Sequence, residues 1–84
     1  MSKAKLRARI IKRLRRMRSE LRQNIADKQS WNDNRQDQPP FDLGWELVML
    51  DAVTKHLEAW EANDMQAVEV WSDKMVQLAD ECFR

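Results

Sequence analysis

The chain has 84 residues, and its 15 basic and 14 acidic side chains give a formal net charge of +1. This length corresponds to one small domain, and a hydrophobic fraction of 43% supplies a modest core, which argues against wholesale disorder. A single cysteine excludes an internal disulfide and fits a reducing cytoplasm, and no apolar run approaches the length of a membrane span.

The charges are divided sharply along the chain. Residues 1–30 carry 11 basic and 2 acidic side chains, whereas residues 31–84 carry 4 basic and 12 acidic ones. We predict an all-α fold in three parts. These are a long basic amphipathic helix over residues 1–28, a polar, proline-containing linker over residues 29–41, and an acidic antiparallel αα-hairpin over residues 42–84.

The N-terminal segment has the pattern of an amphipathic helix. Between Lys3 and Arg22 it holds ten basic residues and one acid, Glu20. At 100° per residue, its large apolar residues fall in a stripe about 100° wide, with Ile11 at the edge. The stripe consists of Leu6, Ile10, Leu14, Met17, Leu21 and Ile25. Strong helix formers dominate the segment and no proline precedes Pro39, so a helix is predicted.

The rest of this helix surface is basic, and we expect it to bind an anionic partner. Seven of the ten basic residues are arginines, whose guanidinium groups can bind phosphate or carboxylate through two hydrogen bonds. Like charges four residues apart repel each other, so a partner of opposite charge would relieve an electrostatic cost. The candidate contact residues are Arg7, Arg9, Lys12, Arg13, Arg15, Arg16, Arg18 and Arg22. The alternative is that this surface is only exposed to solvent.

The segment after the basic helix is predicted to be a linker. Residues 29–41 are polar and include Pro39 and Pro40, which cannot continue a helix. Trp31 and Phe41 are its large apolar residues, and we expect them to hold its two ends against the core, with a binding role for Trp31 as the alternative. A linker of about a dozen residues is long for a compact domain, so it either lies over the core or moves freely.

Two helices are predicted after the linker. Asp42 is placed to cap a helix over residues 43–62, because its carboxylate can accept hydrogen bonds from the N–H groups of the first turn. Apolar residues cover more than half of this helix, which predicts a central position between two neighbours. Asn63 and Asp64 interrupt the pattern, and a further amphipathic helix over residues 65–82 completes an antiparallel hairpin. We expect the basic helix to dock on this hairpin, or on another chain, mainly through its apolar stripe.

No residue pattern indicates an enzyme, a metal site or a cofactor site. His56 is the only histidine and has no second histidine or cysteine spaced to share a metal, so a structural role is favoured. Cys82 follows Glu81, an environment that does not activate a thiol, and is expected to pack rather than react. Gly44 is the only glycine, which excludes a glycine-rich phosphate loop. The chain is therefore predicted to be non-enzymatic, with no cofactor and no small-molecule substrate.

The first functional hypothesis is nucleic-acid binding in a regulatory role, with the basic helix contacting the RNA or DNA backbone. A helix of this composition resembles the arginine-rich RNA-binding segments of viral antitermination and export proteins. The segment lacks aromatic residues that stack on single-stranded bases, which favours backbone contacts over base recognition.

The second hypothesis is a protein-binding inhibitor or adaptor. The basic helix would then bind an acidic protein surface, or the acidic hairpin, with Glu69, Asp73 and Asp80 on its exposed face, would imitate a nucleic acid. Short, highly charged chains without catalytic groups are common among phage proteins that disable host enzymes.

Association with an anionic membrane surface is less favoured, because the apolar stripe lacks the Trp and Phe of interfacial helices. A homodimer is also a candidate, because the apolar surface exceeds what three short helices need.

Overall fold

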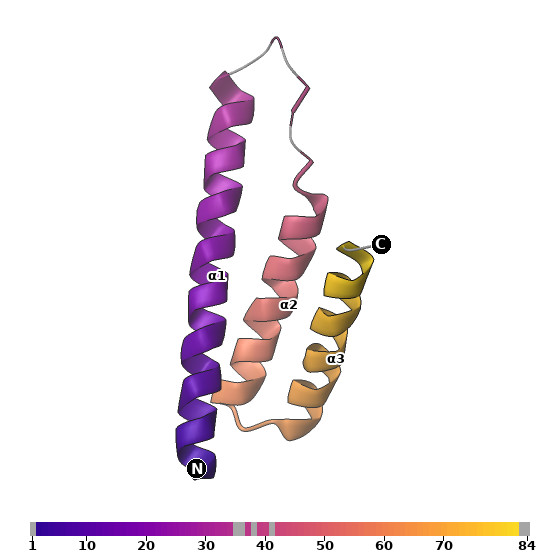
Figure 1. Ribbon diagram of the computed structural model, residues 1–84. Coiled ribbons are helices and arrows are strands. Elements are labelled where there is room, and N and C mark those ends of the chain that lie inside the picture. The colour runs from indigo at the N-terminus through magenta and orange to yellow at the C-terminus, as the bar shows by residue number, and fades with distance from the viewer. Residues whose placement is uncertain (1, 35–36, 38, 41, 83–84) are drawn as a thin grey trace.

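The computed structural model describes residues 2–34, 37, 39–40 and 42–82, and this part of the chain forms three α-helices. Helix α1 spans Lys3–Asn34, α2 spans Gly44–Glu61 and α3 spans Met65–Cys82. The helices lie side by side with α2 in the middle, and α1 extends well beyond the other two (Figure 1). The predicted all-α fold and the central position of the second helix are confirmed.

Helix α1 is longer than the sequence pattern predicted. It continues through residues 29–34, which the pattern assigned to the linker, and Trp31 lies half-buried on it. The polar residues of this stretch are only weak helix formers, costing a few tenths of a kcal/mol each, and neither Gly nor Pro interrupts them. The predicted anchor Phe41 lies outside the described residues.

Helix α2 begins differently from the prediction. Leu43, not Asp42, occupies the N-cap position, and its side chain makes no capping hydrogen bond. The carboxylate of Asp42 still accepts a hydrogen bond from the backbone N–H of Gly44, at 2.8 Å. A Cβ atom at Gly44 would lie 3.1 Å from that oxygen, so the glycine leaves room for the contact.

The turn between α2 and α3 confirms the predicted break. Asn63 has a φ of 57°, in the left-handed region, at the position that follows the C-cap residue Ala62. The N–H groups of Asn63 and Asp64 donate to the carbonyls of Trp60 (3.2 Å) and Ala59 (2.9 Å), which is the hydrogen-bond pattern of a Schellman motif. This short turn makes α3 antiparallel to α2, and therefore parallel to α1 (Figure 1).

The core is organised around α2. Val53 and Leu57 are fully buried, and the other buried members of the core cluster come from all three helices. They are Ile11, Leu14, Met49, Ala52 and Leu78. Both α1 and α3 pack against α2, and in the described part of the chain the backbones of α1 and α3 do not contact each other. The basic helix therefore docks on its own hairpin, through apolar side chains.

Two residues of α1 depart from the predicted apolar stripe. Leu6, placed within the stripe, is 48% exposed, whereas Ile11, placed at its edge, is 8% exposed. Because α2 ends at Glu61, the first turn of α1 has no turn of α2 opposite it, and Leu6 remains at the surface. Further along α1, the buried contact is shifted toward the side of the helix that carries Ile11 and Leu14.

The predicted structural histidine lies in the core. His56 is 8% exposed, and its two ring nitrogens contact Trp60 and Met75. The indole N–H of Trp60 can only donate, so Nε2 of His56 accepts that bond (3.0 Å), while Nδ1 lies 3.0 Å from the sulfur of Met75. This arrangement requires a neutral imidazole, and burial lowers the pKa of His56 below its usual value.

The protein is therefore expected to lose stability as the pH falls from 7.5 to 5.5. In the unfolded chain His56 takes up a proton near its ordinary pKa, whereas the folded chain resists protonation, so acid favours unfolding with a limiting slope of about 1.4 kcal/mol per pH unit. Urea unfolding at a series of pH values would measure this. The variant His56→Gln keeps an acceptor for Trp60 and does not titrate, so its stability should vary less over this range. An equal pH dependence in the two proteins would show that His56 is not the cause.

A basic face on α1 as the candidate binding site

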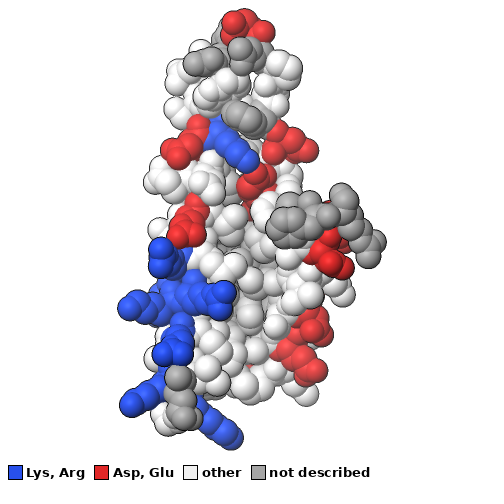
Figure 2. Space-filling model, in the orientation of Figure 1, with Lys and Arg blue, Asp and Glu red and all other residues white. Residues whose placement is uncertain are grey.

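The basic residues of α1 occupy one edge of the molecule. Figure 2 shows Lys and Arg side chains gathered along the N-terminal half of α1, and Asp and Glu side chains along the opposite edge, over α3. The middle of this face, over α2, shows little charge of either sign. The eight predicted contact residues do not share one environment on this helix, and they fall into three groups.

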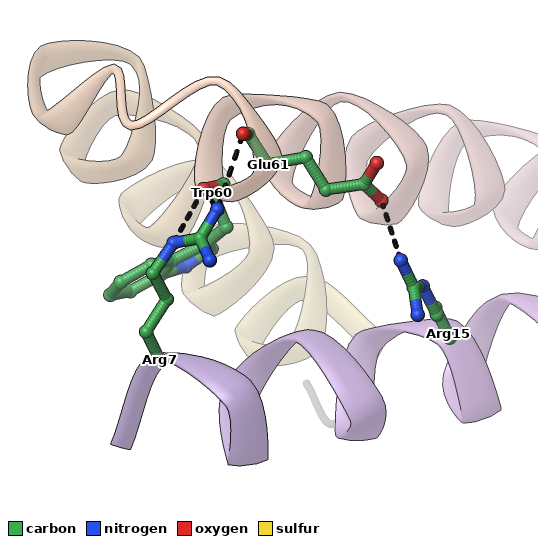
Figure 3. A network of polar contacts seen from close by, with 4 residues as sticks. All are labelled: Arg7, Arg15, Trp60 and Glu61. Carbon is green, nitrogen blue, oxygen red and sulfur yellow. Dashed lines mark hydrogen bonds and ion pairs between the residues drawn. The ribbon is translucent and has the colours of Figure 1, made fainter. Parts of the chain in front are cut away.

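Arg7 has a structural position. Its guanidinium donates hydrogen bonds to the carbonyls of Trp60 (3.0 and 3.2 Å) and Glu61 (3.2 Å) and to the side-chain oxygen of Asn63 (2.9 Å). These carbonyls belong to the C-terminal end of α2 (Figure 3), where a helix lacks internal donors and where a positive charge is favourable. Arg7 therefore caps α2 and fixes α1 against it, so it is not an open contact residue.

A second group lies on the flank of α1 next to α2. On the helical wheel Arg15, Arg18 and Arg22 lie within about 60° of one another. Arg15 pairs with Glu61 at 3.7 Å (Figure 3), but both side chains are about half exposed, so the pair contributes at most about 1 kcal/mol. Arg18 is half-buried and Arg22 is exposed.

The third group forms a continuous surface directed away from the core, which we call the outer basic face. Its members are Lys5, Arg9, Lys12, Arg13 and Arg16, all exposed and all within about 100° on the helical wheel. Arg16 pairs with Glu20 on the same helix, yet its side chain is 82% exposed. In the described part of the chain no acidic side chain pairs with the other four. Lys5 was not among the predicted contacts, although its spacing of four residues from Arg9 places it on this face.

The predicted acidic residues lie on α3. Glu69, Asp73 and Asp80 are exposed, and their spacing places them within about 40° on the outward side of that helix. They are separated from the outer basic face by the width of α2 (Figure 1), so the two sets are not brought together within one chain.

The remaining polar residues support the fold. Lys28 of α1 forms an ion pair with Glu46 of α2, and the hydrogen bond from Lys28 lowers the pKa of that carboxyl group. Across residues 2–34, 37, 39–40 and 42–82, no group of three or more His, Cys, Asp or Glu side chains is arranged to hold a metal ion. The side chain of Cys82 lies outside the part that is described. No helix in the described residues combines the length and apolar character needed to cross a membrane.

Comparison of the chain with protein-family models, with curated proteins and with solved structures returned no match.

Replacing Arg7 is expected to destabilise the protein. In Arg7→Gln the α2 carbonyls lose a charged donor, and hydrogen bonds from charged groups contribute about 1.5–3 kcal/mol, so a loss of about 1–3 kcal/mol in the free energy of unfolding is expected. The matched control is Arg9→Gln, two residues away on the outer basic face, which should change stability by less than about 0.5 kcal/mol. Urea unfolding of the two variants tests this, and equal stabilities would contradict the capping role.

Proposed function

We propose that this chain is a small, non-enzymatic nucleic-acid-binding protein with a regulatory role, and that the outer basic face of α1 contacts the phosphate backbone. The observation that carries the proposal is the accumulation of five exposed cations on one helix face, among which the described residues show one internal ion pair, that of Arg16 with Glu20.

The way in which α1 docks supports this proposal. Apolar residues such as Ile11 and Leu14 attach the helix to α2, and among the predicted contacts Arg7 and Arg15 bond to the described part of the hairpin. The other cations are therefore left at the surface by the fold itself. Residues 5–16 span about 17 Å at 1.5 Å per residue, which is enough to follow several phosphates along one strand.

The composition of the outer basic face favours backbone binding. Arginine can contact a phosphate through two parallel hydrogen bonds, and lysine adds positive charge, so both drive binding through release of counterions. Residues 5–16 contain no aromatic side chain that could stack on a base. We therefore expect strong dependence on salt concentration and weak dependence on nucleotide sequence.

The double variant Lys12→Gln/Arg16→Gln should bind nucleic acid more weakly than the wild type. Removing one cation from a phosphate should reduce the salt slope for duplex DNA by about 0.9, so the slope should fall by roughly 2, and affinity at 0.1 M salt should fall about tenfold or more. Fluorescence anisotropy with labelled duplex DNA, duplex RNA and single-stranded RNA at several salt concentrations would measure both quantities.

The matched control is Lys55→Gln/Lys74→Gln, which removes the same amount of charge from α2 and α3. Lys55 pairs with Asp51 and lies 5.0 Å from the ring of Trp71, away from the outer basic face. This variant should bind like the wild type. If both double variants lose affinity equally, net charge and not the outer basic face controls binding. If the wild type binds none of these nucleic acids below about 100 µM at 0.1 M salt, the proposal is wrong and the inhibitor or adaptor hypothesis takes its place.

A further inference from the structure

A largely uncharged surface lies between the basic edge and the acidic edge of the molecule. On the wheel of α2, Trp45, Met49 and Trp60 fall within about 60° of one another, whereas Asp51, Lys55, Glu58 and Glu61 fall on the other side of the helix. Glu46 lies about 40° beyond Trp60, where it is paired with Lys28 of α1. The strip without charge over α2 in Figure 2 is therefore the tryptophan side. We call this surface, together with the adjoining sides of α1 and α3, the tryptophan face.

The tryptophan face contains two surface pockets with largely apolar walls. One, of about 360 Å³, lies between Leu6, Trp60 and Met65, and the other, of about 190 Å³, lies between Met17, Leu21, Trp45 and Met49. Lys3, Arg7 and Asn63 also contribute to the walls of the first pocket, and Glu20 and Asn24 to those of the second. Three of the lining side chains are large, apolar and exposed. They are Leu6 (48%), Trp45 (38%) and Met65 (51%). A surface of this kind is typical of an interface, because burying it removes apolar area from water.

Residues of α1 and α3 can be matched by their positions along the helix axes. Leu6 of α1 and Met65 of α3 line the same pocket, so these residues lie at one level. At the other end Trp45 lines a pocket with Leu21 and donates its indole N–H to the carbonyl of Leu78, at 3.2 Å. Since α1 and α3 are parallel and rise equally per residue, a residue of α1 lies level with the residue about 59 positions later in α3. Arg9 therefore lies at a similar height to Glu69, and Arg13 to Asp73.

We propose that the tryptophan face binds a second copy of this chain, with the two-fold axis parallel to the helices. A rotation about this axis keeps the position of each residue along the helices and places α1 of one copy opposite α3 of the other. The basic edge of each copy therefore lies over the acidic edge of the other. Arg9 and Arg13 of one copy then meet Glu69 and Asp73 of the second copy. A two-fold axis across the helices would instead place α1 over α1, with like charges opposed. Charge complementarity thus selects both the occupant and its orientation.

The size of the surface agrees with this arrangement. Helices α2 and α3 are each 18 residues long, which is about 27 Å, and the molecule is 23 Å across. The tryptophan face therefore offers about 600 Å² per copy in projection, close to the lower end of the standard range for specific interfaces.

The first test is the oligomeric state. Sedimentation equilibrium of the full chain between about 1 and 200 µM should show a dimer, and Leu6→Glu and Met65→Glu should each weaken it at least tenfold by placing a charge in the apolar interface. The matched control is Val70→Glu, at a residue of α3 that is 62% exposed but lies about 140° from Met65 on the helical wheel. It should dimerise like the wild type. Circular dichroism confirms that each variant is folded.

A charge exchange tests the orientation independently. The variants Arg9→Glu/Arg13→Glu and Glu69→Arg/Asp73→Arg should each dimerise at least tenfold more weakly than the wild type, because each brings like charges together in its own homodimer. An equimolar mixture of the two should form a heterodimer, because opposite charges then face each other at both edges. A wild type that stays monomeric at 200 µM, a dimer unaffected by Leu6→Glu and Met65→Glu, or a mixture that fails to associate would overturn the proposal.

This inference does not depend on nucleic-acid binding. Lys12 lies about 120° from Leu6 and about 140° from Met17 on the wheel of α1, so Lys12→Gln should dimerise like the wild type. Loss of dimerisation in that variant would mean that the outer basic face, and not the tryptophan face, holds the two copies together.

Discussion

The apolar contacts of α2 with both of its neighbours hold this molecule together. Val53 and Leu57 are fully buried, and around them pack Ile11 and Leu14 from one helix and Leu78 from another. Since α1 and α3 make no backbone contact within the described residues, each of them depends mainly on α2 for its position. A change in α2 therefore alters its packing with both α1 and α3, and the three helices should unfold as one cooperative unit.

This arrangement also explains why so much charge remains at the surface. An apolar stripe is sufficient to attach α1, because burial of each large side chain contributes about 1.5–3 kcal/mol, whereas an exposed ion pair contributes at most about 1 kcal/mol. Opposite net charges on the helix and the hairpin suggest extensive internal pairing. In the structure Arg15 and Lys28 make ion pairs that join α1 to α2, and within the described residues no acidic surface lies opposite the outer basic face.

The features that depend on local sequence pattern were predicted correctly. The features that depend on how the helices are positioned relative to one another were not. The hairpin turn at Asn63 and Asp64, the bounds of the last helix and the central position of α2 follow from periodicity and capping chemistry, and all are confirmed. The exposure of Leu6 was not predictable, because it depends on where α2 ends relative to α1. The capping role of Arg7 was missed, although the helical wheel places Arg7 on the apolar stripe, in line with Leu14 and about 160° from Arg9. Helical spacing alone could also have added Lys5 to the outer basic face.

The parallel course of α1 and α3 has an electrical consequence. Because a basic helix and an acidic helix lie on opposite sides of a third, a single copy of the chain carries a transverse dipole moment although its net charge is only +1, and this moment cancels in the proposed dimer. A highly charged polymer at a distance comparable to the Debye length, about 10 Å at 0.1 M salt, acts on this dipole with a torque before contact occurs. The protein should therefore approach a polyanion already turned with α1 toward it. The same separation of charge should allow the molecule to be retained on both cation- and anion-exchange media at neutral pH, by different edges.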